Sequence, residues 1–329
     1  MARGHPGLPK STKPLILEKA SLFSIVAGID SDTKARDRVL KMENEFRRKI
    51  GTHLKSLPAE KAQFKKLNTN PFVLSFYSKQ QGFRHVSEIE KLIVPAKVFS
   101  SMETSAGRMV EEVVLPVYGW ESVGSSMQTD DSVIDGLKKQ GSDLLKAVTL
   151  KSGPRCLNDD SARNTGLAIA THVPSWAVAH KVSNVDFTYG VLYGTKAISN
   201  KKDWHVLRTI AESVSVGGKV TDGPDQKWCV SYRKNNVNVT ATVRLGMEWW
   251  SYLGGNTAWL EVIAALIRAC IEPTSDALTA GNFMIPDLSS IISLEGMPED
   301  YNISILQRSQ LPWLLFLARH FCDGYASVH

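Results

Sequence analysis

Two oppositely charged residues, Asp135 and Lys151, lie sixteen positions apart, and each borders a short apolar segment. The polar segment 138–142 (Lys-Lys-Gln-Gly-Ser) between them is typical of the link that joins two strands of a hairpin. Because side chains alternate along a strand, Thr149 and Lys151 are expected on the same face of the second strand. A carboxylate and an ammonium at the open end of such a hairpin can hold a divalent cation and activate a water molecule, as in metal-dependent phosphodiesterases.

The spacing of this pair is a weak signal by itself, since an aspartate at such a distance before a lysine occurs often in any chain. The competing interpretation is a surface aspartate and an unrelated lysine at a strand end. The elements that surround the pair must therefore decide whether the two side chains meet.

The predicted elements indicate a single α/β domain with a small mixed sheet and a helical N-terminal extension. The continuous apolar run 187–193 is typical of a central strand that is covered on both faces. We predict a disordered basic tail over residues 1–14, the helical extension over 15–100, and the sheet with the C-terminal helices over 101–329. Further strands are predicted at 228–232 and 237–243, and helices at 33–57, 100–115, 155–173, 201–214, 247–253, 257–271 and 311–322.

Composition and charge limit the possible classes of protein. The chain has 329 residues, of which 43% are hydrophobic and 22% charged, so it has the composition of an ordinary globular protein and not of a low-complexity chain. Its net charge of +6 favours an anionic partner, of which nucleic acid is the commonest. The four cysteines have no metal-site spacing, which predicts buried or free thiols in a reducing compartment; they are Cys156, Cys229, Cys270 and Cys322.

Signals for export or membrane insertion are not expected in this sequence. Residues 1–14 are basic and rich in Pro and Gly, without the apolar core of a signal peptide. The most apolar helical stretch, 259–271, carries Glu261 and Arg268, which favours a protein core over a bilayer. We therefore expect a soluble, cytoplasmic protein without membrane partners.

Several short blocks follow one another between residues 70 and 272, and the predicted hairpin is one of them. They are Asn70-Pro71-Phe72, 107–112 with Leu115-Pro116, Val133-Ile134-Asp135 leading to Leu150-Lys151, 190–194, 204–208 and 248–253. In this order, the sequence resembles type II restriction endonucleases of the PD-(D/E)xK superfamily, in the branch that cuts interrupted palindromes with a GG…CC core. The resemblance implies a restriction-endonuclease-like α/β core, with the nuclease domain over residues 101–329.

The resemblance also assigns roles to the hairpin residues. It implies that Asp135 is the first metal-binding carboxylate and that Lys151 is the catalytic lysine, which orients or deprotonates the attacking water beside Mg²⁺. Two residues before the lysine the family usually has Glu or Asp, but this chain has Thr149. Threonine is a poor Mg²⁺ ligand, so either a second acid comes from elsewhere or the metal is held through water.

Related enzymes with Ser or Thr at this position recruit an acid from a nearby helix. Glu111, in the predicted helix 100–115, is the favoured candidate for catalysis and metal binding; Asp159 and Asp160 are the others. Glu112 is less suitable, because adjacent residues point about 100° apart on a helix. Asp143 is expected in the hairpin turn, facing solvent.

Two groups of residues are candidates for DNA contacts. Arg155 is predicted to contact a phosphate or a guanine, with an ion pair to Asp159 or Asp160 as the alternative. Asn158 could reach a phosphate or a base edge, but a helix N-cap explains it better. The basic face of helix 33–57 could approach DNA phosphates or could simply be solvated; it comprises Lys41, Arg47, Arg48 and Lys49.

Through the resemblance, the sequence predicts a Mg²⁺-dependent restriction endonuclease that acts as a homodimer on double-stranded DNA. Its site would be a palindrome with a GG/CC-rich core, possibly interrupted, and a cognate DNA methyltransferase would be its genetic partner. One alternative is a repair or structure-specific nuclease of the same fold. The other is a DNA-binding protein whose catalytic site has decayed, an alternative that Thr149 keeps open.

Overall fold

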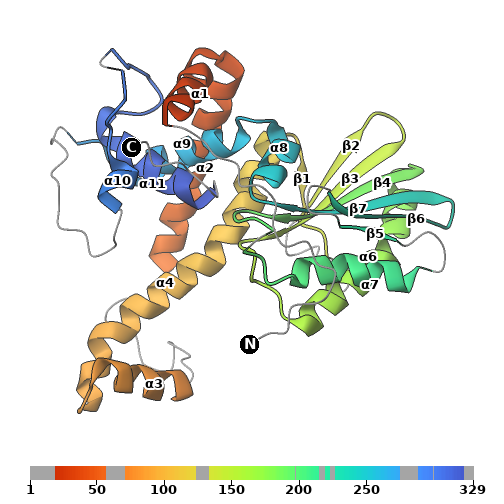
Figure 1. Cartoon of the computed structure of the whole chain (residues 1–329), viewed down its shortest axis with the longest axis horizontal. Helices are drawn as coiled ribbons and strands as arrows, with labels where there is room; N and C mark the ends of the chain where they lie inside the picture. The colour runs from red at the N-terminus through yellow and green to blue at the C-terminus, as the bar shows by residue number, and fades with distance from the viewer. Residues whose placement is uncertain are drawn as a thin grey trace.

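The computed structural model describes residues 19–56, 71–123, 133–196, 198–214, 219–222, 227–274, 288–298 and 300–321. The predicted tail over residues 1–14, Asn70 and Cys322 lie outside these ranges. In the described part, a mixed seven-stranded sheet has helices on both faces, so the chain is an α/β protein (Figure 1).

The sheet is built on the predicted hairpin. Its strand order is β1-β2-β3-β4-β7-β6-β5, and β4 is parallel to both β3 and β7, whereas the other pairs are antiparallel. The predicted central strand is thereby confirmed in β4. The strands are β1 (Glu121–Ser122), β2 (Gly136–Gln140), β3 (Leu144–Lys151), β4 (Asn184–Val191), β5 (Val220–Thr221), β6 (Trp228–Lys234) and β7 (Val237–Leu245).

Helices make up most of the remaining described chain. The described α-helices are α1 (Lys19–Ser31), α2 (Thr33–Ser56), α3 (Pro71–Gln81), α4 (Glu90–Met109), α5 (Leu115–Val117), α6 (Asp159–His180), α7 (Lys202–Ser213), α8 (Met247–Gly254), α9 (Ala258–Cys270), α10 (Leu288–Ile292) and α11 (Leu311–Phe321). A π-helical turn, η3 (Val110–Val114), joins α4 to α5. The predicted boundary at residue 100 falls inside α4, which extends from the sheet edge towards α3 (Figure 1).

Several predicted boundaries were wrong. The helix predicted over 100–115 is the second half of α4, which already begins at Glu90, followed by the π-turn η3. Segment 138–142 was predicted as a link, but its first three residues belong to β2, and the turn is confined to 141–143, where Gly141 adopts a φ of 65°. Helix α6 was predicted to end at residue 173, yet it continues through Pro174 to His180. Val173, Pro174 and Ala177 are all buried, so packing of this last segment outweighs the hydrogen bond that proline removes.

Two apolar cores lie on opposite faces of the sheet. On one face, Val148 and Leu150 of β3 pack with buried residues of α1, α2, α8, α9 and α11. On the other face, Leu145 and Ala147 pack with residues of α6 and α7. Trp249, Trp250 and Trp259 are fully buried in the first core, where they are packing residues.

Helix α8 comes very close to the central strands. A Cβ atom on Gly190 of β4 would lie 2.8 Å from the Trp249 ring and 2.9 Å from the Leu150 side chain. Only glycine leaves room for this contact, which holds the C-terminal ends of β3 and β4 beneath α8.

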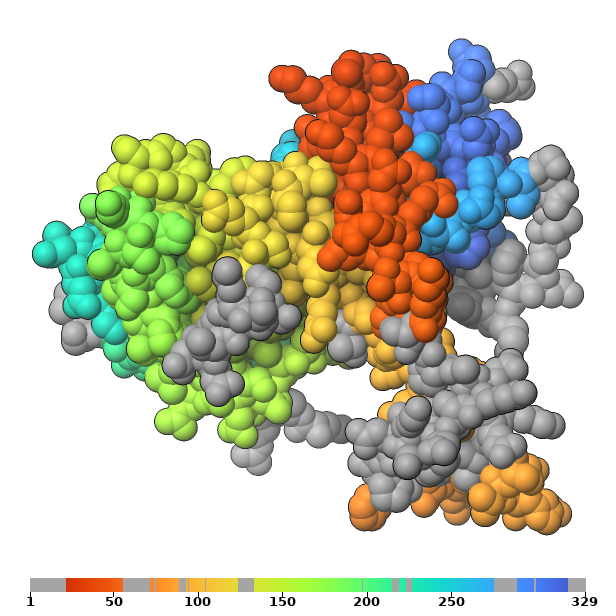
Figure 2. Space-filling model, turned by 180° about the vertical axis from the view of Figure 1, so that it is seen from behind, coloured from red at the N-terminus to blue at the C-terminus, as the bar shows by residue number. Residues whose placement is uncertain are grey.

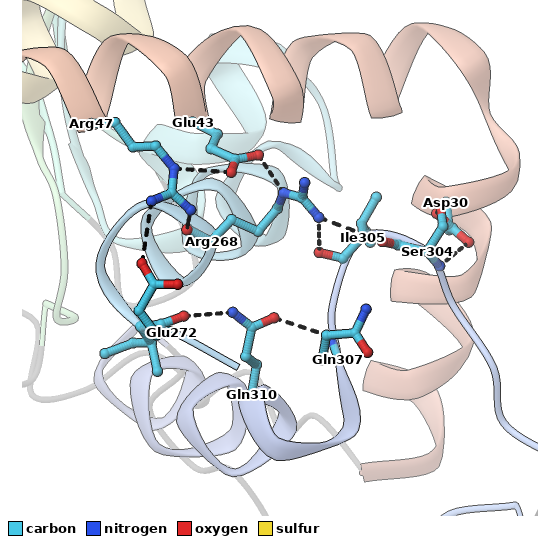
Figure 3. Close-up of polar contacts among 10 residues, drawn as sticks. Asp30, Glu43, Arg47, Arg268, Glu272, Ser304, Ile305, Gln307 and Gln310 are labelled. Atoms are coloured by element: carbon cyan, nitrogen blue, oxygen red, sulfur yellow. Dashed lines mark hydrogen bonds and ion pairs between the residues drawn. The ribbon is translucent and has the colours of Figure 1, made fainter. Parts of the chain in front are cut away.

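The N-terminal helices of the predicted extension share an apolar core with the C-terminal helices. Polar contacts also join these two groups of helices (Figure 3). Glu43 of α2 accepts hydrogen bonds from Arg47 and from Arg268 of α9, and Arg268 also reaches the Ile305 carbonyl at 2.8 Å. Elsewhere between these helices, Arg38 forms a two-pronged ion pair with Glu261 at 2.7 and 2.8 Å. We call these pairs, Arg38–Glu261 and Arg47–Glu43–Arg268, the helical seam.

Two further predictions concern cysteines and membranes. Cys156, Cys229 and Cys270 are free thiols, as predicted. Among the helices of the described ranges, none combines the length and the apolar character that crossing a bilayer requires.

Candidate active site

Asp135 is held rigidly where β2 begins. The residue is 8% exposed, and its Oδ2 accepts hydrogen bonds from the Leu150 amide at 2.6 Å and from Thr149 Oγ1 at 3.0 Å. Its own amide donates to the Val148 carbonyl at 2.8 Å. The predicted hairpin therefore does bring Asp135 against the end of β3. Thr149 occupies the position of the expected acid and orients Asp135 through its hydroxyl group.

Lys151 is the last residue of β3 and is half-buried. Its backbone pairs in parallel register with Val191 of β4, and its carbonyl accepts a hydrogen bond from the Leu192 amide at 3.0 Å. The ammonium group thus extends from a well-anchored strand end, next to two carboxyl groups whose charges act on one another.

Glu111 is the second of these carboxyl groups. It lies in η3, and burial raises the pKa of its carboxyl to about 7, with a further increase from the charge of Asp135. The nearby Lys151 and Arg108 lower this pKa, so both Asp135 and Lys151 lie within electrostatic reach of Glu111. A π-turn shifts side-chain directions relative to a regular helix and is frequent at functional sites. Here it belongs to the segment that carries Glu111 toward the hairpin.

The other acidic residues near the hairpin face elsewhere. Glu112 is exposed and pairs with Lys49 of α2, in agreement with the prediction that it is the less suitable neighbour. Asp159 pairs with Lys202 of α7, and this hydrogen bond lowers the pKa of the Asp159 carboxyl. Asp160 is exposed in the first turn of α6.

Asp143 lies in the turn between β2 and β3, is exposed as predicted, and accepts a hydrogen bond from the Ser183 amide at 2.6 Å. It therefore ties the turn to the start of β4 at the opposite end of β3 from Lys151.

The two predicted DNA contacts lie just after the lysine. Arg155 is exposed and donates from Nε to the Ile198 carbonyl at 3.2 Å, while Asp159 is engaged by Lys202. Within the described ranges Arg155 forms no ion pair with Asp159 or Asp160, so that alternative is wrong. Asn158 is the N-cap of α6, because its Oδ1 accepts a hydrogen bond from the Ser161 amide at 2.8 Å. The preferred interpretation of Asn158 is thus confirmed.

Sequence reasoning missed Tyr189, which is buried in β4 directly beside Thr149 in the parallel register. Its hydroxyl pKa is raised first by burial and then by the charges of Asp203, Cys156 and Asp135. The position of Tyr189 in the apolar run 187–193 placed it in a central strand, but the strand register was needed to place it next to the hairpin.

The donor groups at this site suit a hard cation. Across the described ranges, no group of three or more His, Cys, Asp or Glu side chains is arranged to hold a metal ion. Two carboxylates, Asp135 and Glu111, remain as the protein donors. Mg²⁺ is commonly bound by one or two carboxylates, with waters and substrate phosphates completing its octahedron. This pair of carboxylates is therefore chemically suited to Mg²⁺ with a phosphate substrate.

Comparison with known proteins adds no family to this geometry. No protein-family model matches the chain, and no curated protein matches it either.

Proposed function

We propose that this protein is a Mg²⁺-dependent type II restriction endonuclease with a restriction-endonuclease-like core. The observation that carries the proposal is the convergence of Glu111, Asp135 and Lys151 from η3, the start of β2 and the end of β3, with the pKa of Glu111 raised to about 7. Strongly shifted pKa values are frequent at catalytic and binding sites. Two acids and a lysine from separate elements, with one shifted pKa among them, therefore favour a functional site over a solvated surface.

Each residue would have a defined role in phosphodiester hydrolysis. Asp135, oriented by Thr149, and Glu111 in its ionised form would hold Mg²⁺. When bound, Mg²⁺ offsets charge on the scissile phosphate and makes a bound water more acidic. The Lys151 ammonium would donate hydrogen bonds to the attacking water and to a non-bridging phosphate oxygen, stabilising the charge that develops there.

The biological setting follows from the chemistry proposed. One such site cuts one strand, so cleavage of both strands of a palindrome calls for two copies related by two-fold symmetry. We propose a homodimer that works on double-stranded DNA in the cytoplasm, with a GG/CC-rich recognition core and a cognate DNA methyltransferase that protects the host sites.

The test is digestion of a sequenced plasmid with Mg²⁺, followed by mapping of the ends. We expect discrete fragments from the parent protein, and a loss of about 10³-fold or more in Asp135→Asn and Lys151→Ala, equivalent to about 4 kcal/mol of barrier. Asp143→Asn and Lys139→Ala are matched controls, because they change the same residue types at exposed positions of the same hairpin. Cleavage by D135N or K151A within tenfold of the parent would refute the proposal.

The same assay separates the two alternatives. Preference for junctions or flaps over plain duplex would indicate a structure-specific or repair nuclease. Tight binding to one DNA sequence in Ca²⁺, without cleavage in Mg²⁺, would indicate a DNA-binding protein with a decayed site, as the threonine at position 149 allows.

A further inference from the structure

A basic pocket lies beside the candidate active site, between α2 and the last turns of α4. Its volume is about 340 Å³, and Arg48, Lys49 and Thr52 of α2 face Ser105 and Arg108 of α4 across it. Seen from behind, α2 and the segment that ends α4 lie side by side (Figure 2). The space is large enough for a phosphate group.

The charge of the pocket selects an anion. Arg48, Lys49 and Arg108 are cationic, and Glu112 is the one acid among its lining residues, where it is paired with Lys49. Arg48 is 62% exposed and its ion pair with Glu45 lies on the helix surface, where such pairs are weak and exchange readily. Guanidinium groups match phosphate oxygens with two parallel hydrogen bonds, so Arg48 and Arg108 together form a suitable cradle.

The pocket and the candidate active site are connected through η3. Glu111 and Glu112 are consecutive residues. The carboxyl group of Glu111 interacts electrostatically with Asp135 and Lys151, whereas Glu112 lines the pocket. Arg108 is common to both, since it lines the pocket and its charge lowers the pKa of Glu111. A polymer with phosphates at regular intervals can occupy both places at once, which a single free phosphate cannot do.

We propose that the pocket formed by Arg48, Lys49 and Arg108 binds a backbone phosphate of nucleic acid that flanks the reacting one. The proposal rests on the proposed function in naming DNA as the polymer and in taking the neighbouring phosphate as the reacting one, whereas the anion-binding role of the pocket does not depend on cleavage. Arg48 and Lys49, which belong to the basic face of α2, would thus contact a DNA phosphate and would not simply be solvated.

The experiment measures binding of a labelled short duplex of random sequence, without divalent metal, over a range of salt concentrations. Every protein carries Asp135→Asn, so that no DNA is cut. Loss of one phosphate contact lowers the slope of log Kd against log salt by about 1. We expect this decrease, with about tenfold weaker binding at low salt, for Arg48→Gln combined with Arg108→Gln. The matched control, Arg36→Gln with Arg233→Gln, removes the same charge from α2 and β6, away from the pocket, and should keep the parent slope.

The outcomes separate this inference from the nuclease proposal. An unchanged slope in the double variant, with an unchanged melting temperature, would overturn the inference even if the parent enzyme cuts DNA. Failure of the parent to bind the duplex would also overturn the inference. So would a pocket that binds only free phosphate, seen as a melting temperature that inorganic phosphate raises in the parent but not in the variant, while the DNA slope is the same in both. A reduced slope supports it even if no cleavage is ever found.

Discussion

Charged side chains serve two different purposes in the helical seam and in the candidate active site. In the seam, Glu261 is 0% exposed and its two oxygens accept hydrogen bonds from Arg38, Tyr118 and Thr257. At the site, the carboxyl group of Glu111 has no hydrogen-bond partner within the described residues, and its pKa is raised to about 7.

Lys151 likewise has no ion pair or hydrogen bond from its ammonium to any residue that the structure describes. Buried charges that only hold a fold together must be paired, because an unpaired one is costly. Charges that act on a substrate must keep their bonding capacity for it. The two regions therefore differ in pairing: the charges of the helical seam are all paired, whereas at the candidate site, within the described ranges, only Asp135 is held by hydrogen bonds, to Thr149 and Leu150.

The largest expected effect on stability comes from breaking the seam. Glu261→Gln removes the charge that Arg38 neutralises, and we expect the free energy of unfolding to fall by about 3 kcal/mol. This is the low end of the range for buried pairs, because Arg38 is 28% exposed and can be partly hydrated. Urea denaturation measures the change. Glu212→Gln, which breaks the exposed pair with Arg208, is the control and should change stability by less than about 0.5 kcal/mol. Equal effects of the two variants would contradict the contrast.

Glu111, which is unpaired within the described ranges, should make the free energy of unfolding depend on pH. Its pKa is about 7 in the folded protein and near 4.5 without burial. Between these values the folded state holds a proton that the unfolded state has released, so the free energy of unfolding falls as pH rises. Because Glu111 is only half-buried, we expect this fall to be about 1–2 kcal/mol after allowing for solvent screening. Glu111→Gln should lack it, so the parent-minus-variant difference between about pH 4.5 and pH 7.5 measures it. A difference that rises with pH would refute the assignment.

The same proton competes with a metal ion for Glu111. As the pH is raised towards about 7, the apparent affinity for Ca²⁺ or Mg²⁺ should increase by up to tenfold for each pH unit, because the competing proton is lost. Above about pH 7 the affinity should stay constant. Titration calorimetry on the parent and on Glu111→Gln tests this. The variant should bind more weakly and without this pH dependence, whereas equal binding by both proteins would remove Glu111 from the metal site.

The fold and the site differ in how far the sequence predicts them. Periodic apolar patterns located α2, α7, α9 and the strands β4, β6 and β7 to within a few residues, because each element buries one face or both. The Arg38–Glu261 pair spans 223 positions, and no local pattern indicates it. Pro174 stopped the predicted α6 too early, because the burial that carries the helix through it is a tertiary effect.

The site was predicted in part for the same physical reason. Asp135 and Lys151 belong to one hairpin, so their approach follows from local pairing. Glu111 was one of three candidate acids, and a regular helix gives no sign of the π-turn that contains it. Thr149 was read as a missing carboxylate, whereas its hydroxyl donates to Asp135, a contact that only the folded hairpin reveals.

Thr149 is the next test of the contrast, because it is a paired group beside unpaired ones. Thr149→Val removes one hydrogen bond to a charged acceptor, and Leu150 still donates the other. We expect unfolding to become easier by about 1.5 kcal/mol and plasmid cleavage to slow by about tenfold. Thr149→Ser keeps the hydroxyl and should retain most of the cleavage rate. If the valine and serine variants lose activity equally, the hydroxyl does not orient Asp135.

Asn158 marks the boundary between the two kinds of polar group, and its expected effect is the smallest. Its side-chain oxygen is already used as the N-cap of α6, so Asn158→Ala should cost about 1 kcal/mol of stability and leave DNA affinity unchanged. Asn158→Asp sharpens the test, because aspartate caps equally well and its charge suits a helix N-terminus. If Asn158 only caps the helix, the aspartate variant keeps both stability and DNA affinity. If Asn158 also touches a phosphate, like-charge repulsion weakens duplex binding in the aspartate variant while the melting temperature stays the same, and Asn158 then belongs with the functional groups.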